Sequence, residues 1–268
     1  MNLKKRTKHQ DSSNIVFYSI YCEELDLKFE CVVGNNVLHK FPLHIHDSLC
    51  IGLITKGQRD LILSEHSKII NPNEIFVINR LQPHAINQVA PHSYIVITIK
   101  GEKLGGLVFE NVIKSGISVD LFIQLFNVIV ENKTNKLPGK WNSLYAYLVD
   151  TAQVLPEDVS FYGKYIRNSI EYIHTNYRLQ ISVGDMAKQD CMSTFHFCRL
   201  FKQLTGISPH NYLKQCRLSY SYRCLRENLP VFDTAIKTGF YDSSHFIRTF
   251  QTYMAVSPKE YQDTITKQ

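Results

Sequence analysis

The chain has 268 residues, of which 44% are hydrophobic and 20% charged, which is typical of a globular protein with room for two domains. It contains no run of about 18 uncharged apolar residues, so a membrane span is not expected. The basic stretch at 4–8 precedes polar residues instead of an apolar core, which argues against a signal peptide.

The net charge of +6 is confined to one end of the chain. Residues 160–268 carry 14 basic and 8 acidic side chains, whereas residues 1–159 carry 16 of each. A basic domain joined to a neutral one is typical of a nucleic-acid binder with a separate sensing module, although surface lysines alone can produce the same excess. The seven cysteines form no C-x-x-C pair and are odd in number. They predict a cytoplasmic protein without a disulfide framework, a structural zinc site or a cofactor.

The first hundred residues are predicted to form short β-strands. Segments rich in Val, Ile, Phe and Tyr alternate with turn residues such as Asn71-Pro72-Asn73. The predicted strands are 27–33, 49–55, 60–63, 74–78 and 94–99. This number of short strands favours a β-sandwich or a small barrel.

Two helices are predicted next, at 118–132 and 141–154. Leu121, Phe122 and Leu125 belong to an apolar helical face, and Pro138-Gly139 is interpreted as the break between the helices. The helices can pack back on the β-domain, which is the simpler arrangement, or pair with a second copy of the chain. Residues 155–158 (LPED) are the predicted linker.

From residue 161 onward the pattern is helical. Ser182 and Asp185 form a capping-box pattern, Ser193 is a predicted N-cap, and Gly206 a predicted left-handed C-cap. The predicted helices are 161–176, 183–189, 194–204, 208–226, 231–238, 243–254 and a last one that begins at Pro258.

A repeat lies within this helical segment. HFCRLFKQLTGISP at 196–209 returns as HFIRTFQTYMAVSP at 245–258, with an offset of 49 throughout. Such a period indicates a duplicated supersecondary unit. Each copy holds a short helix, a tight turn and a second helix, which is the helix-turn-helix arrangement that places the second helix in the major groove. The residues expected in the cores and helix crossings are Ala187, Phe197, Phe201, Ala235, Phe246 and Phe250.

These motifs resemble the DNA-binding domain of the AraC/XylS family of bacterial transcription regulators over residues 165–262. The most specific part is the second unit, with AIKTGF at 235–240, followed by Asp242, Ser244, Phe246, Arg248, Phe250, Ser257-Pro258 and Tyr261. The first unit keeps Ala187, Ser193, Phe197, Phe201, Gly206, Pro209, Tyr212 and Arg217-Leu218. The resemblance implies helix-turn-helix units at about 181–204 and 230–254, joined by one long helix.

Three positions depart from the family pattern. Ala255 stands where the family usually has glycine after the second recognition helix, and an alanine at positive φ costs about 1 kcal/mol. We therefore expect this helix to end differently from the first. Ser221 and Thr234 replace an alanine and an isoleucine that are common in the family.

The resemblance also implies which residues face DNA bases. They are Thr194, Phe195, Cys198 and Arg199 in the first recognition helix, and Ser243, Ser244, Ile247 and Arg248 in the second. An arginine can bond guanine in a bidentate way, which gives about 1–3 kcal/mol of discrimination. The two arginines can also be merely solvated or salt-bridged. His196 and His245 either reach phosphates or lie on the helix surface. Two joined units would enter major-groove segments about 34 Å apart.

The N-terminal half resembles a cupin barrel. His44-Ile45-His46 and Pro83-His84 stand in the order of the two cupin motifs, in which three histidines can converge on a metal. The glutamate that follows in metal cupins is absent, and Cys50, in that stretch, can substitute as a soft ligand. We predict that His44, His46 and His84 line or rim an effector pocket without a metal.

The predicted fold class is α+β: a cupin-like sensor domain at 1–103, connecting or dimerisation helices and a linker at 104–158, and an all-α DNA-binding domain at 159–268. The resemblance implies a sequence-specific transcription regulator, an activator controlled by a small molecule or another signal, and not an enzyme. Its expected partners are double-stranded promoter DNA, RNA polymerase, a small-molecule effector and a second copy of the chain, but no membrane. The alternatives are a metal-dependent cupin enzyme with an accessory helical domain, and a β-domain that binds a partner protein. A bound ligand is expected to change how the two middle helices pack or dimerise.

Overall fold

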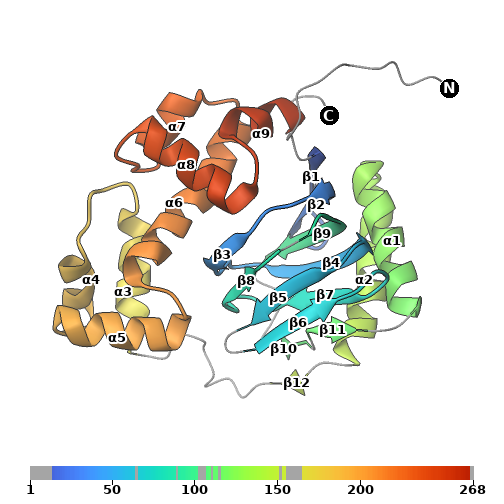
Figure 1. The fold of residues 1–268 in the computed structure, drawn as a ribbon, viewed down its shortest axis with the longest axis horizontal. Coiled ribbons are helices and arrows are strands. Elements are labelled where there is room, and N and C mark those ends of the chain that lie inside the picture. Colours follow the sequence, from blue (N-terminus) through green and yellow to red (C-terminus); the bar gives the residue numbers. More distant parts are fainter. Residues whose placement is uncertain are drawn as a thin grey trace.

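The computed structural model describes residues 14–63, 66–88, 90–101, 107–109, 111–113, 116–150, 153–154 and 165–265. A β-domain occupies the middle of the molecule, with two helices against one side and an all-helical domain against the other (Figure 1). The predicted α+β class is confirmed. Among the described helices, none has the length and apolar content that crossing a bilayer requires.

Two antiparallel sheets form the β-domain. The larger has the order β1 (Asn14–Cys22), β2 (Leu27–Val37), β9 (His92–Lys100), β4 (Leu49–Lys56), β7 (Ile75–Ile78) and β11 (Val112–Ile113). The smaller has the order β3 (Phe41–His44), β8 (His84–Ile86), β5 (Arg59–Leu63) and β6 (His66–Ile70). A short pair joins β10 (Leu107–Val108) to β12 (Gln153–Val154). Side chains of the larger sheet alternate between two cores, as the two-residue period of a strand requires.

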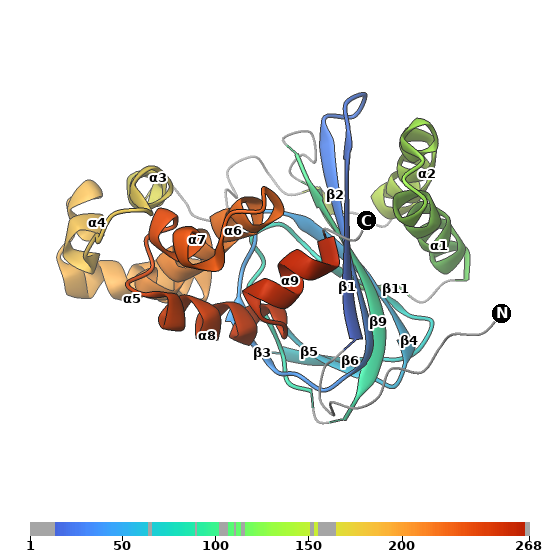
Figure 2. The same cartoon turned by 90° about the horizontal axis from the view of Figure 1, so that it is seen from above.

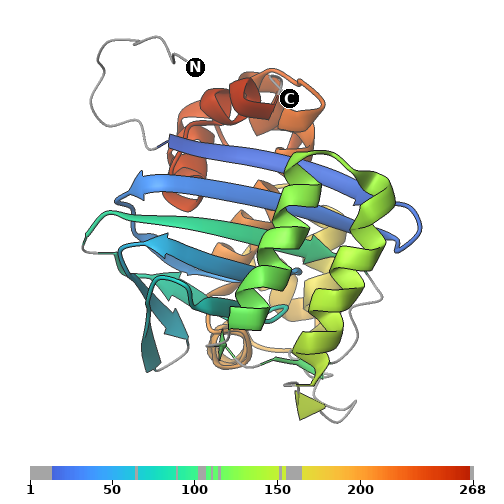
Figure 3. The same cartoon turned by 90° about the vertical axis from the view of Figure 1, so that its right-hand side faces the viewer.

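The two middle helices pack against the outer face of the larger sheet (Figure 3). They are α1 (Gly116–Val130) and α2 (Leu137–Val149), with a short 3-10 turn η2 (Thr134–Lys136) between them. Trp141 of α2 lies edge-on to Phe29 of β2, with ring centroids 5.6 Å apart. Of the two arrangements considered for these helices, the structure shows packing on the β-domain.

Pro138 opens helix α2 instead of separating it from α1. The N–H groups in the first turn of a helix have no partner within the helix. A proline, which has no N–H, is therefore tolerated there. The expectation of a break at Pro138-Gly139 was therefore wrong, and α2 begins at Leu137, four residues before the predicted start.

The C-terminal domain contains two helix-turn-helix units at the two ends of a long helix (Figure 1). Its helices are α3 (Arg167–Asn176), α4 (Val183–Gln189), α5 (Thr194–Thr205), α6 (Pro209–Arg226), α7 (Val231–Lys237), α8 (Ser243–Met254) and α9 (Pro258–Ile265). The predicted linker at 155–158 and the predicted start of the first helix at 161 lie outside the described residues. The four repeated phenylalanines are completely buried, and Ala187 and Ala235 are buried at the helix contacts, as predicted.

Local capping explains where several of these helices begin and end. The Ser182 hydroxyl accepts the Asp185 N–H at 3.1 Å, and Asp185 accepts the Ser182 N–H at 3.0 Å, which completes the predicted capping box. Gly206 ends α5 with φ 75°. Ala255 ends α8 in the same left-handed region, with φ 60°. The expectation that α8 ends differently was therefore wrong: α8 ends in the same conformation as α5, and the alanine is strained there.

The C-terminal helical domain packs directly against the β-domain at a contact that we call the domain interface (Figure 2). On the side of the second unit, Phe17 of β1 contacts Tyr261 of α9 with ring centroids 4.8 Å apart, and Arg226 of α6 forms an ion pair with Glu30 of β2.

The first unit is attached to the β-domain by separate contacts. The Ile45 N–H donates to Gln215 Oε1 of α6 at 3.0 Å. A methyl group on Gly206 would lie 2.8 Å from Pro83. Both helix-turn-helix units thus touch the β-domain, whereas α1 and α2 lie on its opposite side (Figure 1).

Candidate DNA interface and sensor site

The first recognition helix, α5, exposes most of the residues that were predicted to face bases. It begins after Ser193, whose hydroxyl accepts the His196 N–H at 3.3 Å. Phe195 is 73% exposed, and the Arg199 guanidinium lies 5.9 Å from the centre of its ring. The Arg199 guanidinium thus lies over the exposed ring of Phe195, which is one helical turn earlier in α5. Thr194, His196 and Arg199 are exposed, and Cys198 is half-buried.

The second recognition helix, α8, presents a smaller and more polar surface. Asp242 caps it by accepting the His245 N–H at 2.7 Å. Ser244 and Arg248 are exposed, whereas Ser243 and Ile247 are half-buried.

The two repeat histidines are not equivalent. The His245 ring lies 5.5 Å from Phe240, and partial burial followed by the charge of Lys214 lowers its pKa. His196 on α5 is exposed. His245 therefore contributes to packing, and His196 is the freer of the two.

The two arginines of the repeat differ from other arginines of this domain. Arg223 on α6 is held by Glu227 at 2.9 Å, and Arg226 pairs with Glu30. Within the described part of the chain, Arg199 and Arg248 form no ion pair. Their guanidinium groups keep the donors that a base or a phosphate would need.

Sequence reasoning missed one exposed residue beside α8. Tyr241 directly precedes the N-cap Asp242 and is 86% exposed. A residue just before the N-cap of a recognition helix lies beside the helix end that enters the groove, and this position was the available signal.

The three histidines predicted for the effector pocket come together in the structure. Their ring nitrogens lie within 4.8 Å of one another, and His44 and His84 have ring centroids 4.0 Å apart. Burial, followed by the charge of His46, lowers the pKa of His44 to about 4. Burial likewise lowers the pKa of His84 well below its usual value. Burial also lowers the pKa of His46, so the neutral form is favoured in all three imidazoles.

Arg59 is a second buried group of the β-domain that sequence reasoning missed. It is 3% exposed and donates from Nε to His92 Nε2 at 3.1 Å. Its guanidinium lies 4.2 Å from the ring centre of Tyr94 and 5.0 Å from that of Phe76. Burial lowers its pKa to about 10. Aromatic rings, and no described carboxylate, accompany this cation.

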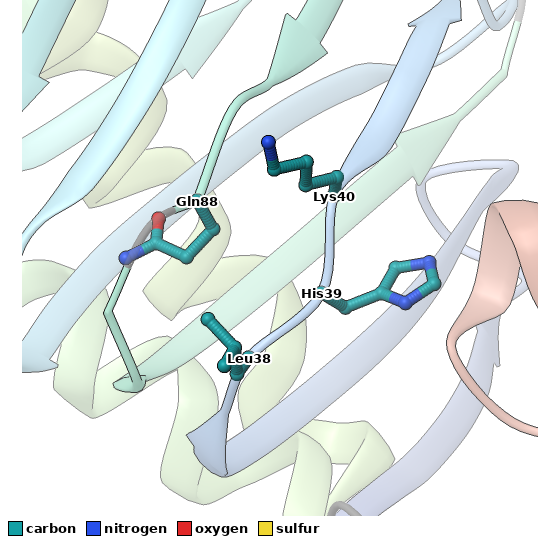
Figure 4. A pocket seen from close by; sticks show the side chains of 4 residues that line it. All are labelled: Leu38, His39, Lys40 and Gln88. Carbon is teal, nitrogen blue, oxygen red and sulfur yellow. The ribbon is translucent and has the colours of Figure 1, made fainter.

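An open pocket of about 380 Å³ lies at the edge of the β-domain, where Leu38, His39, Lys40 and Gln88 surround it (Figure 4). Gln88 is buried, and its Nε2 donates to the carbonyls of Gln58 and Ala90, both at 2.6 Å, while its Oε1 has no hydrogen-bond partner among the described residues. His39 lines this pocket and also contacts the Thr252 carbonyl of α8 through Nε2 at 2.9 Å. His39 thus lies between the pocket and the second recognition helix.

Two family models match the chain. A helix-turn-helix domain matches residues 186–264, and an AraC-like ligand binding domain matches residues 26–116. The two matches cover the DNA-binding domain and the β-domain described above.

Curated relatives resemble the chain over most of their length. The Msm operon regulatory protein of Streptococcus mutans is 26% identical, covering 85% of this chain and 88% of the relative. The Lactose operon transcription activator of Staphylococcus xylosus is 23% identical, covering 86% and 87%. Among solved structures, unsaturated fatty acid bound ToxT from Vibrio cholerae has a TM-score of 0.59 at 14% identity, covering 98% and 99%. This last likeness concerns the fold alone.

Proposed function

Because the chain belongs to the AraC family of transcription regulators, with a helix-turn-helix domain after an AraC-like ligand-binding domain, we propose that it activates transcription from promoters with two unlike half-sites. In this proposal it acts in the cytoplasm, has no catalytic activity of its own, and responds to a small molecule bound by the β-domain. One of its relatives carries the name of a transcription activator, and RNA polymerase is the partner that activation requires. A second copy of the chain is the proposed partner of the α1–α2 side, where Ile117 is 64% exposed.

Two exposed arginines that form no ion pair with any described residue carry the proposal. Arg199 and Arg248 occupy the same position in α5 and α8, so each supplies the same bidentate donor to its groove segment. The neighbouring residues differ, with Phe195 in the first helix against Ser244 in the second, and Cys198 against Ile247. An aromatic ring and a hydroxyl prefer different base edges. Two copies of one unit therefore recognise two different sequences.

Selection of DNA fragments by the purified full chain, followed by binding measurements on variants, tests this proposal. Arg199→Ala and Arg248→Ala should each weaken specific binding by about 1–3 kcal/mol, or about 5- to 150-fold, and leave non-specific binding nearly unchanged. Arg223→Ala is the matched control, because it removes an exposed arginine of the same domain that lies outside both recognition helices. Equal losses on specific and non-specific DNA would instead assign the two arginines to phosphate contacts.

The pocket of Figure 4 supports a direct route from effector to DNA. A small molecule there contacts His39, and His39 contacts the last turn of α8 through the Thr252 carbonyl. Binding would then shift the population between arrangements in which this contact is made or broken. The route does not pass through α1 and α2, which lie on the other side of the β-domain. The predicted pocket residues His44, His46 and His84 belong to the neighbouring strands β3 and β8 and to the turn after β3.

Replacing His39 tests this route without knowledge of the effector. His39→Ala should change the affinity of the full chain for its selected DNA at least twofold, because α8 loses a hydrogen-bond partner in the β-domain. His66→Ala, an exposed histidine on the edge strand β6, is the control. Identical DNA affinities for both variants and the unmodified chain would refute the route and leave the assignment of the recognition helices intact.

A further inference from the structure

The nitrogens of the histidine cluster are already oriented for metal binding. Nδ1 of His44 lies 2.8 Å from the Pro42 carbonyl, and Nδ1 of His84 lies 2.9 Å from the Gln82 carbonyl. A carbonyl only accepts, so in both rings Nδ1 carries the proton and Nε2 keeps its lone pair. Nδ1 of His46 lies 3.2 Å from the Ser48 carbonyl and 3.1 Å from the Ser48 hydroxyl, which can accept or donate. Backbone carbonyls that fix the tautomer in this way are the usual second partners of metal-binding histidines.

Cys50 supplies a fourth group to this cluster. Its Sγ lies 3.3 Å from Nε2 of His46, and the residue is 3% exposed. Cys50 follows His46 by four residues. It lies at the start of β4, which begins at Leu49 just after the turn that carries His46. The cluster therefore has three imidazole nitrogens within 4.8 Å of one another and a buried thiol sulfur beside one of them, that of His46.

We propose that His44, His46, His84 and Cys50 bind one divalent transition-metal ion, with zinc as the expected occupant. Neutral imidazoles and a thiolate are the ligands that zinc takes in tetrahedral sites, and a sulfur ligand disfavours magnesium and calcium. At Zn–N bonds of about 2.0–2.1 Å, tetrahedral ligand nitrogens lie roughly 3.4 Å apart. The rings, now within 4.8 Å, must therefore close by little more than an ångström.

The proton balance of this binding is simple. The three imidazoles are neutral and give lone pairs without losing a proton. The Cys50 thiol gives up its proton to solvent as the metal–sulfur bond forms, so one proton is released for each ion bound. Burial raises the pKa of this thiol to about 12, so the metal, and not the surrounding protein, has to favour the thiolate.

The proposed site lies at the domain interface. The His44 ring is 6.0 Å from the ring of Tyr253, a residue in the last turn of α8. A metal ion would hold β3, β8 and the start of β4 together at the place where they support α8. The site is separate from the DNA-facing ends of the recognition helices, so its existence does not depend on the proposed specificity.

Cobalt(II) added to the full-length, metal-free chain is the probe. We expect one Co²⁺ per chain, a visible absorption of tetrahedral intensity, a thiolate-to-cobalt charge-transfer band in the near ultraviolet, and a raised Tm. Cys50→Ser should remove the charge-transfer band, and His84→Gln should weaken binding at least tenfold. Cys216→Ser is the matched control, because Cys216 is also a buried cysteine beside a histidine, with Sγ 3.6 Å from Nδ1 of His174. Its spectrum should match that of the unmodified chain.

Binding of DNA, measured in the same samples, shows whether each variant is folded. Cobalt binding that survives in His84→Gln, a charge-transfer band that survives in Cys50→Ser, or less than about a tenth of an ion per chain would overturn the proposal. If His84→Gln does not fold, His46→Asn takes its place. If Cys50→Ser does not fold, the protection that cobalt gives Cys50 against alkylation is measured in the unmodified chain instead. If the unmodified chain gives the cobalt spectrum but binds no DNA specifically, the proposed function fails and the metal site stands.

Discussion

Replacing Ala255 with glycine should stabilise the protein, because this residue ends α8 at φ 60°. The left-handed conformation costs an alanine about 1–2 kcal/mol. Against this gain, glycine adds about 0.4–1 kcal/mol of freedom to the unfolded chain, and the half-buried methyl group contributes less than about 0.8 kcal/mol. The net expectation for Ala255→Gly is a stabilisation of about 0.5 kcal/mol, which raises Tm by about 1–2 °C for a chain of this size.

Calorimetry or thermal unfolding followed by circular dichroism measures this shift, and Gly206 offers the matched opposite change. Gly206→Ala introduces the same strain at φ 75° and brings its methyl group to 2.8 Å from Pro83. It should therefore lower the free energy of unfolding by at least about 1 kcal/mol. A lower Tm for Ala255→Gly, or an unchanged Tm for Gly206→Ala, would refute the argument from backbone strain.

Two further substitutions test charged groups of the β-domain. Burial by itself raises the pKa of Glu30, but the charges of Arg226 and Lys28 lower it overall, so this ion pair stabilises the fold above the unfolded pKa of about 4.3. That contribution is lost as the pH falls through the lowered pKa of Glu30 in the folded protein. Glu30→Gln should therefore lower the free energy of unfolding by about 1–2 kcal/mol at pH 7 and leave it unchanged in stronger acid. Urea titrations at several pH values measure this difference. Arg59→Met removes a buried cation that has no described carboxylate partner and keeps most of the side-chain volume, so the free energy of unfolding from urea titration should stay constant or rise. A fall of more than about 2 kcal/mol would mean that the guanidinium is a net stabiliser.

The helices of the second half could be predicted well because their signals are local. A capping box and side-chain N-caps define the starts of α4, α5 and α8, and the predicted ranges 183–189 and 243–254 agree with the structure. Strands without such signals were missed. β6 (His66–Ile70) is an exposed edge strand that lacks an apolar face, and β8 (His84–Ile86) is too short to show a period.

The residues proposed to carry function divide in the same way. Arg199 and Arg248 were selected because a repeat placed them at equivalent helical positions. Arg59 and His39 were not, since their roles depend on partners far away in the sequence: His92 lies 33 residues from Arg59, and Thr252 lies 213 residues from His39. Contacts of this separation are set by how the chain folds back on itself, and one sequence carries no local trace of them.

The separate attachment of both helix-turn-helix units to the β-domain has a consequence for the choice of promoters. The long helix α6 joins the two units, and each unit also contacts the β-domain: Gly206 lies against Pro83 in the first, and Tyr261 lies against Phe17 in the second. Under the proposed function, the β-domain therefore fixes the distance between the two recognition helices. A tight interface should accept half-sites at one separation only, and a loosened interface should tolerate promoters with a base pair added or removed between them.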